Sequence, residues 1–308
     1  MLSRIAESLF WIGRYVERAD DTARILDVHL QMLLEDSWLE EGEACRALLS
    51  VMGAEPPEHD VDRRYVLDRL AYDAATPSTI VGALGAAREN ARRARETVSS
   101  EMWETLNTTF INIEWSRTTS TTPHQFFGWV RERSTLVAGI ADSTMTRDDA
   151  WRFLVLGRSI ERADMTARLL ASSAIGASAS TWTTMLRSCG AYESYLRTYR
   201  GVASDERAAQ FLLLDRLFPR SVVHSLRSAE GSLSDLALAG GRRVGFDDEA
   251  QRLLGTARAA LEYRAPGRML EDLPQRMTDL QRTCNLVSQA VTTRYFTGAT
   301  AATWSGGN

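Results

Sequence analysis

One charged helical segment occurs twice in this chain, and the two copies stand 144 residues apart. The sequence GRYVERADDTARIL at residues 13–26 returns as GRSIERADMTARLL at residues 157–170, with ten of fourteen positions identical. The identities include charged positions that a shared amphipathic pattern does not require, so we interpret the repeat as an internal duplication. The sequence predicts one domain over 1–296, made of two pseudo-repeats of about 1–145 and 146–296. A tail over 297–308, rich in Gly, Ala and Thr, is expected to be disordered.

The hydrophobic pattern is helical throughout. From Ile5 to Leu33 apolar residues recur in steps of three and four, which is typical of an amphipathic helix, and we find no convincing strand. We therefore predict an all-α fold, an internally duplicated antiparallel bundle of about ten helices. The expected helices cover residues 3–34, 38–53, 61–74, 77–113, 124–142, 147–173, 181–200, 205–217, 220–239, 247–263 and 268–296.

Composition excludes several classes of function. The net charge of -4 argues against nucleic acid as the main partner, because such a partner requires a dense basic surface. All 36 basic residues are arginine, so Schiff-base chemistry and a lysine-bearing P-loop are excluded. No metal or cofactor motif is present, and we expect no cofactor. No signal peptide or membrane span is recognisable, so we expect a cytoplasmic protein that does not enter a membrane.

The cysteines do not form a recognisable site. Cys45, Cys189 and Cys284 are widely separated, which fits neither a disulfide framework nor a zinc site. We interpret them as reduced thiols packed in the core.

The charges of the repeated segment are the main candidate site. On a helix, Gly13, Glu17, Asp20 and Arg24 fall on one stripe that borders the apolar stripe. Like charges stand three or four residues apart within the segment, so their partners are expected on another element. The candidate residues are Arg14, Glu17, Arg18, Asp20, Arg24, Glu161, Arg162, Asp164 and Arg168.

Three interpretations of this cluster are open at the level of sequence. In the first, the two copies cross closely at Gly13 and Gly157, and Glu17 meets Arg162 while Glu161 meets Arg18 in a partly buried ion network. In the second, the arginines line a cleft and grip an anionic small molecule or peptide. The third is a four-carboxylate dimetal site made of Glu17, Asp20, Glu161 and Asp164. The absence of an accompanying histidine and the adjacent arginines disfavour the metal site.

A second candidate surface lies in residues 86–107, AARENARRARETVSSEMWETLN. Such a charged run is usually a solvated helix face, but here polar residues and a tryptophan accompany the charges, so a binding surface is the alternative. The candidate residues there are Arg88, Asn90, Arg95 and Glu101. The corresponding segment of the second half, AEGSLSDLA, lacks these charges.

Several of these segments together resemble the bacterial alpha-E family, an all-helical domain named for its ER motif. They are MLSRIAESLFWIGRYVERADDTARIL, the second IERAD segment and ARENARRARETVSSEMWETLN, with Glu17-Arg18 and Glu161-Arg162 matching the two ER pairs. The resemblance implies a circularly permuted ATP-grasp protein as partner, and often a transglutaminase-like protein. It also implies an accessory or substrate-binding subunit in an amidoligase or peptide-modification pathway.

Two other functions are weighed beside this one. The chain could be an independent enzyme in which Glu17 or Glu161 is a general base with a pKa raised by burial. Alternatively, it could be a purely structural scaffold that associates through the surface around residues 88–107.

Overall fold

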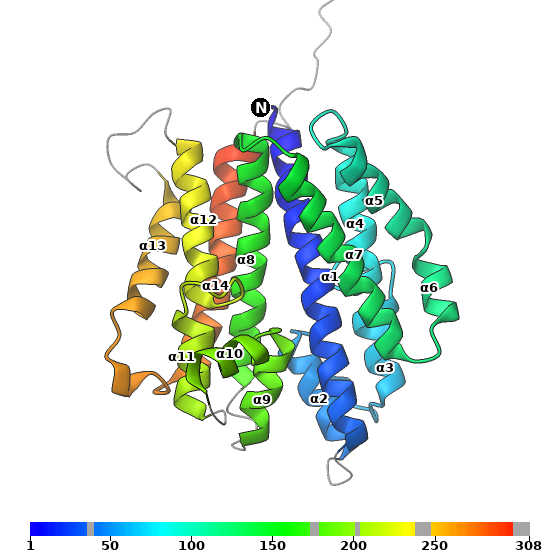
Figure 1. Ribbon diagram of the computed structural model, residues 1–308, viewed down its shortest axis with the longest axis vertical. Helices are drawn as coiled ribbons and strands as arrows, with labels where there is room; N and C mark the ends of the chain where they lie inside the picture. The colour runs from blue at the N-terminus through cyan, green and yellow to red at the C-terminus, as the bar shows by residue number, and fades with distance from the viewer. Residues whose placement is uncertain (36–39, 173–178, 201–203, 238–247, 298–308) are drawn as a thin grey trace, which may run out of the picture.

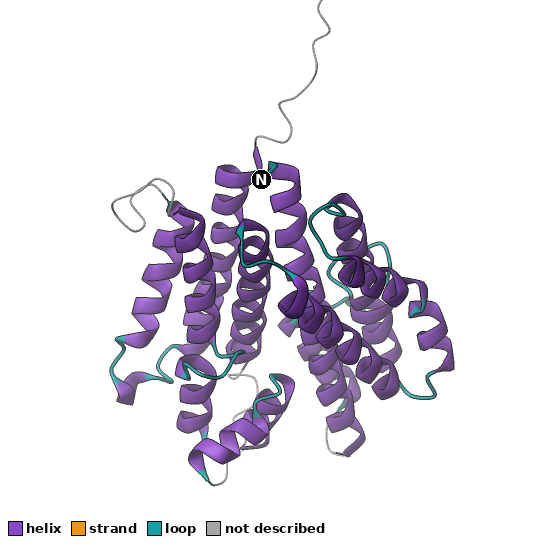
Figure 2. Ribbon diagram, turned by 45° about the horizontal axis from the view of Figure 1, so that its top comes forward, coloured by secondary structure: helices purple, strands orange, loops and turns teal. Residues whose placement is uncertain are grey.

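The fold consists of helices and their connections. The computed structural model describes residues 1–35, 40–172, 179–200, 204–237 and 248–297. Fourteen α-helices and no strand occur in these ranges, which confirms the all-α prediction (Figure 2). The tail expected to be disordered lies, from residue 298 onward, outside the described residues. No helix in the described ranges is long and apolar enough to cross a lipid bilayer.

Two long helices form the centre of the molecule, and the others flank them (Figure 1). The central pair is α1 (Ser3–Glu35) and α8 (Asp149–Ala171). On the side of α1 lie α4 (Ile80–Arg93), α5 (Ser100–Ile111), α6 (Ile113–Thr119) and α7 (Pro123–Thr144). On the side of α8 lie α12 (Val222–Ala237), α13 (Glu249–Glu262) and α14 (Leu273–Val291). The end of the bundle far from the N-terminus holds α2 (Glu41–Val51), α3 (Arg63–Leu67), α9 (Ala179–Ser188), α10 (Tyr192–Tyr199) and α11 (Asp205–Leu214).

The two central helices approach each other at glycines. A Cβ atom at Gly13 would lie 2.1 Å from the carbonyl oxygen of Leu154, and one at Gly157 would lie 2.0 Å from that of Phe10. Both clashes are with backbone, so no side-chain movement could relieve them. Each glycine costs about 1 kcal/mol of helix propensity relative to alanine, and the close crossing explains why the sequence keeps both. Buried apolar residues from both halves form one hydrophobic core around this crossing.

Most predicted helices are observed with small shifts at their ends, but two of them are interrupted and α6 was not predicted, so the described residues hold fourteen α-helices rather than the expected ten or so. The helix expected over 77–113 is divided into α4 and α5 by residues 94–99, and Ser99 begins α5 by accepting a hydrogen bond from the Met102 amide at 3.1 Å. The helix expected over 181–200 is divided into α9 and α10 at Gly190, whose φ of 60° belongs to the left-handed region that glycine adopts freely. The three cysteines are free and buried, as predicted.

Candidate functional site at the crossing of α1 and α8

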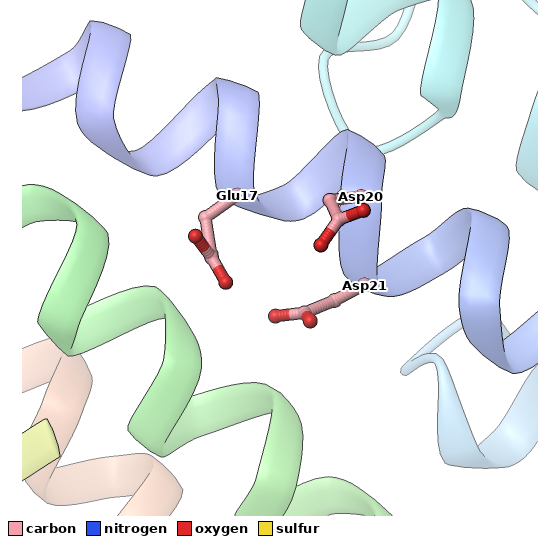
Figure 3. A group of neighbouring side chains, drawn as sticks. All are labelled: Glu17, Asp20 and Asp21. Carbon is pink, nitrogen blue, oxygen red and sulfur yellow. The ribbon is translucent and has the colours of Figure 1, made fainter. Parts of the chain in front are cut away.

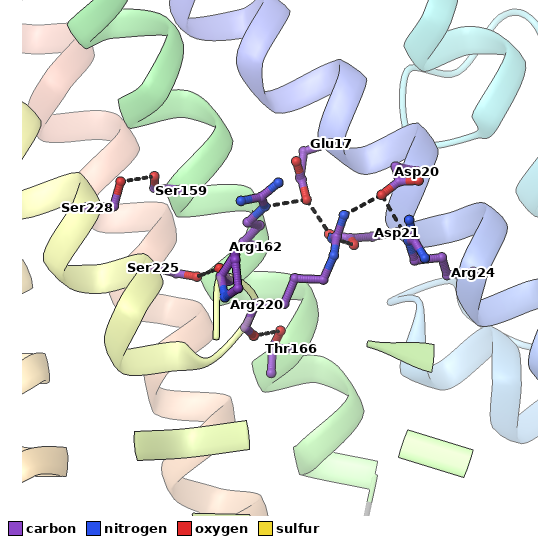
Figure 4. Close-up of polar contacts among 11 residues, drawn as sticks. Glu17, Asp20, Asp21, Arg24, Ser159, Arg162, Thr166, Arg220, Ser225 and Ser228 are labelled. Carbon is purple, nitrogen blue, oxygen red and sulfur yellow. Dashed lines mark hydrogen bonds and ion pairs between the residues drawn. The ribbon is translucent and has the colours of Figure 1, made fainter. Parts of the chain in front are cut away.

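Charged residues of the repeated segments meet where α1 and α8 cross. Glu161 accepts hydrogen bonds from Nε of Arg14 and Nε of Arg18, each at 2.6 Å. Glu17 accepts one from Nε of Arg162 at 2.6 Å (Figure 4). Both glutamates are buried, with 4 % of Glu17 and 1 % of Glu161 exposed. The structure therefore has the reciprocal ion network of the first interpretation, in which each ER glutamate binds an arginine of the other segment.

Arg220 completes the network from outside the repeated segments. It lies just before α12 and reaches across to α1, where Nη1 donates to Glu17 at 2.6 Å and the guanidinium also binds Asp20 and Asp21 (Figure 4). One arginine thereby binds three buried carboxylates, two of which have a second guanidinium partner, Arg162 on Glu17 and Arg24 on Asp20. Because two guanidinium nitrogens serve three acids, the contact also fixes how the start of α12 sits against α1.

The four carboxylates proposed as dimetal ligands do not come together as one ligand set. The group that the described residues do form is Glu17, Asp20 and Asp21, whose ligand atoms lie within 4.8 Å of one another (Figure 3). Glu161 and Asp164 do not belong to it, and the guanidinium of Arg220 binds all three of its members. The arrangement is an arginine–carboxylate network rather than the site that four inward-facing carboxylates would make.

The outer candidates of each segment pair within their own helix. Nε of Arg24 donates to Asp20 at 3.0 Å, and Nε of Arg168 donates to Asp164 at 2.7 Å. Arg18 also donates Nη1 to the carbonyl oxygen of Pro77 at 3.2 Å, which ties α1 to the segment before α4. Of the nine predicted residues of the repeated segments, Arg14, Glu17, Arg18, Glu161 and Arg162 pair across the crossing, whereas Asp20 with Arg24 and Asp164 with Arg168 pair within one helix.

The arginines decide the protonation of the ER glutamates. Burial alone would raise the pKa of Glu17, but Arg162 and Arg220 hold it at about 2. In the same way, burial opposes the ionised form of Glu161, yet Arg14 and Arg18 hold its pKa at about 2. The expectation of a raised pKa at these glutamates is therefore wrong. A carboxylate with such a low pKa and with its oxygens occupied is a poor general base at neutral pH.

The neighbouring aspartates behave in the opposite way. Burial raises the pKa of Asp21 well above its ordinary value. Arg220 opposes this shift, and the negative charges of Glu17 and Asp20 add to it. Burial also raises the pKa of Asp164 in spite of Arg168. The network thus holds strongly ionised glutamates beside aspartates that take up a proton more readily.

A cavity of about 140 Å³ opens beside the crossing on the side of α7. Its polar lining comes from Glu17 and Asp20 of α1, from Arg158 and Arg162 of α8, from Arg220, and from Ser134 and Thr135 of α7. Ile12, Val16, Val137 and Leu154 are among its apolar walls. Ser134 of α7 is 3 % exposed, and its Oγ has no hydrogen-bond partner among the described residues. The charged crossing therefore borders a small space that has both arginines and apolar surface.

The second candidate surface divides into two parts. Arg88 donates Nε to Asn107 Oδ1 at 2.8 Å and lies over the Trp103 ring, as Arg95 does at 4.9 Å from the ring centroid. Asn90 instead lines a separate groove with residues of α1, including Trp11 and Tyr15.

Glu101 lies at the start of α5 and is exposed. The structure thus joins Arg88 and Arg95 around Trp103, while Asn90 belongs to another surface.

The sequence did not single out three residues of the crossing. Arg158 stands 144 residues after Arg14, so the repeat itself contained the signal. Asp21 has Met165 at the corresponding position, and Arg220 lies outside the repeated segments, where no periodicity points to it. A pair of buried Asp27 and exposed His124, with Oδ1 and Nδ1 2.6 Å apart, was also not predicted.

That pair borders a larger cavity of about 670 Å³ between α1, α3 and α7. Its walls are mainly apolar and include Leu30, Leu67 and Phe127.

Comparison with known proteins identifies the family. Residues 1–296 match Alpha-E, a predicted alpha-helical domain with a conserved ER motif. An uncharacterized protein of Mycobacterium bovis is 26 % identical over 268 residues, covering 76 % of this chain and 30 % of that protein. An uncharacterized protein of Mycobacterium tuberculosis is 25 % identical over the same length and coverage. The chain thus spans about 30 % of the length of these relatives. No solved structure matches it significantly.

Proposed function

This chain belongs to the Alpha-E family, and we propose that it is a non-catalytic, substrate-binding helical partner of an ATP-grasp amidoligase. The observation that carries the proposal is the state of the ER glutamates. Both are buried, both are bound by two arginines, and both have a pKa near 2, so neither is placed to accept a proton. On this proposal the ER motif holds the two helices together at their crossing, and the ATP-grasp partner carries out the reaction.

The length of the relatives supports a domain that acts together with other domains or chains. In the mycobacterial proteins the similarity covers about 30 % of the chain, so most of each protein lies outside the part that matches. An ATP-grasp partner and a transglutaminase-like protein are what the family resemblance implies. ATP-grasp chemistry joins an activated carboxylate to an amine, and a helical domain can contribute by binding one of the two reactants in position.

The surface also offers an apolar site for a partner. Ile111 at the end of α5 and Trp115 on α6 are 64 % and 63 % exposed, and Phe110 is 39 % exposed. Large apolar side chains in such a cluster are typical of association surfaces, where aromatic residues contribute most of the binding energy. Arg88 lies 5.0 Å from the Phe110 ring centroid, so the charged surface around Trp103 continues into this patch.

The duplication of the chain belongs to the same proposal. The contacts of the crossing are reciprocal: Gly13 faces Leu154 and Arg158, while Gly157 faces Phe10 and Arg14, and each residue of one set stands 144 positions from its counterpart in the other. Such reciprocity is what two copies of one helix produce when they pair about a twofold axis. On this view one ancestral half paired with itself before fusion.

The proposal is tested by reconstitution with an ATP-grasp protein of the same organism. ADP formation in the presence of candidate amino acids and peptides is measured with and without this chain, and we expect it to depend on the chain. The variant Trp115→Ser should weaken the association, whereas Tyr263→Ser, which changes an aromatic residue 85 % exposed at the end of α13, should not.

A Glu161→Gln variant separates the proposal from catalysis by the chain itself. We expect the activity of the complex to follow the folded fraction of this variant, measured by circular dichroism on the same sample. Turnover by the chain alone, or full folding with complete loss of activity, would instead assign the chemistry to the glutamate. ADP formation that is equal with and without the chain would refute the partnership.

A further inference from the structure

The two halves of the charged crossing differ at one arginine. On one side, Arg14 spans the space between Glu161 and α14, because Nε donates to Glu161 at 2.6 Å and Nη1 donates to Ser288 Oγ at 2.8 Å. Arg158 occupies the corresponding position of α8, yet it forms no ion pair or hydrogen bond with the described residues. Its guanidinium carbon lies 5.8 Å from the centroid of the Trp151 ring.

Arg220 occupies the position at Glu17 that the repeat would give to Arg158. Arg220 binds Glu17 from the segment before α12, together with Arg162, and so supplies the second guanidinium that Arg14 supplies to Glu161. Ser134 of α7 is left with an unpartnered hydroxyl, whereas Ser288 of α14 accepts from Arg14. The cavity of about 140 Å³ lies where these unused groups meet, with Arg158 and Ser134 both in its lining.

The charge of this region favours an anion. Four guanidiniums, from Arg24, Arg158, Arg162 and Arg220, face three carboxylates, from Glu17, Asp20 and Asp21, so at least one positive charge is in excess even when Asp21 is ionised. The excess falls on Arg158, whose carboxylate partner is missing. Glu17 and Asp142 act on Arg158 only through space, because Glu17 is bound by Arg162 and Arg220 and Asp142 is paired with Arg147 at 2.9 Å. A half-buried guanidinium without a partner is costly, and a bound anion would remove that cost.

We propose that this cavity binds the carboxylate of a small, partly apolar acid, such as an amino acid or the end of a peptide. Arg158 provides the principal charge, with Arg162 at its side, and the Ser134 hydroxyl donates a hydrogen bond to the second oxygen. The apolar walls of Ile12, Val16 and Val137 contact the carbon chain of the acid. A cavity of this volume accommodates a group about as large as a benzene ring. The bound acid would be the reactant that the chain holds for its ATP-grasp partner, and in this respect the inference rests on the proposed function.

The test is binding of sodium propionate to the intact chain, followed by isothermal titration calorimetry at constant ionic strength, with inorganic phosphate in a parallel titration. We expect propionate to bind in the millimolar range. Arg158→Gln should weaken it at least ten-fold, because a hydrogen-bonded charge is lost, and Ser134→Ala about five-fold. Arg152→Gln is the matched control on the same helix, since Arg152 pairs with Asp235 at 2.8 Å away from the cavity, and it should bind like the wild type.

The variants also keep the test independent of folding. Ser134→Ala removes a buried hydroxyl that has no partner, so it is expected to fold at least as stably as the wild type while binding propionate less tightly. Equal affinity in the wild type, Arg158→Gln and Ser134→Ala would overturn the site, as would no binding at all. Tighter binding of phosphate than of propionate would overturn the carboxylate assignment. These titrations use the isolated chain, so their failure is distinguishable from a failure to support ADP formation by the ATP-grasp partner.

Discussion

Replacing Gly157 by alanine tests how closely α1 and α8 must approach. The new Cβ would lie 2.0 Å from the carbonyl oxygen of Phe10, whereas ordinary carbon–oxygen contacts are about 3.3 Å or longer. The two helix backbones would therefore have to separate by more than about 1 Å at the point where the buried ion pairs form. Overpacking of this kind costs about 3 kcal/mol or more, and alanine returns about 1 kcal/mol of helix propensity. We expect a net loss of about 2–4 kcal/mol.

The matched control is Gly139→Ala in α7, where an added Cβ meets nothing within 4 Å. That variant should gain up to about 1 kcal/mol from helix propensity alone, so the same substitution changes sign between the two sites. Urea unfolding followed by far-UV circular dichroism measures both values, and a thermal scan should show a fall of several degrees for Gly157→Ala. A Gly157→Ala protein as stable as the wild type would refute the close backbone crossing.

Three further predictions concern the charged network. Glu161→Gln should lose about 3–5 kcal/mol in urea unfolding, because it leaves buried Arg14 and partly buried Arg18 without a charged partner, whereas an exposed pair such as Arg92 with Glu89 should contribute less than about 1 kcal/mol. Arg220→Ala should create affinity for Mg²⁺ or Mn²⁺ in calorimetry, since three carboxylates within 4.8 Å lose the one guanidinium that binds all of them and keep only Arg162 and Arg24; unchanged metal binding would contradict this. The stability supplied by Glu17 and Glu161 is present above about pH 5 and should be lost as the pH falls toward about 2, because their folded pKa values are depressed; unfolding free energies that are flat over this range would be the contrary result.

The crossing itself could be predicted from the sequence because the repeated segment cannot pair its own charges within one helix. Glu17 and Asp20 are like charges on one helix stripe beside the core, and such a stripe needs partners on another element. The presence of a second copy supplied the partner, and the pairs of Glu17 with Arg162 and of Glu161 with Arg18 are those observed. The periodicity of a helix determines which charges share a face, so this part of the site could be predicted from the sequence.

The difference between the two sides of the crossing, at Arg14 and Arg158, could not be predicted in the same way. Arg220 reaches Glu17 from a segment 203 residues away that shows no periodicity, and only the folded chain brings the two together. The unpaired state of Arg158 follows from that long-range contact, although the position itself could be read from its match to Arg14. The breaks within the predicted helices 77–113 and 181–200 were missed for a local reason, because Ser99 and Gly190 interrupt otherwise continuous helical patterns.

The protonation of the ER glutamates tests the central claim most directly. In the folded chain labelled with ¹³C at the glutamate carboxyl carbons, NMR spectra recorded through a pH titration report Glu17 and Glu161 individually once each is assigned by its glutamine variant. The network predicts that both carboxylates stay ionised as the pH is lowered and take up a proton only near pH 2 or when the chain unfolds. A titration of either glutamate near neutral pH would contradict the account and make that residue a candidate general base.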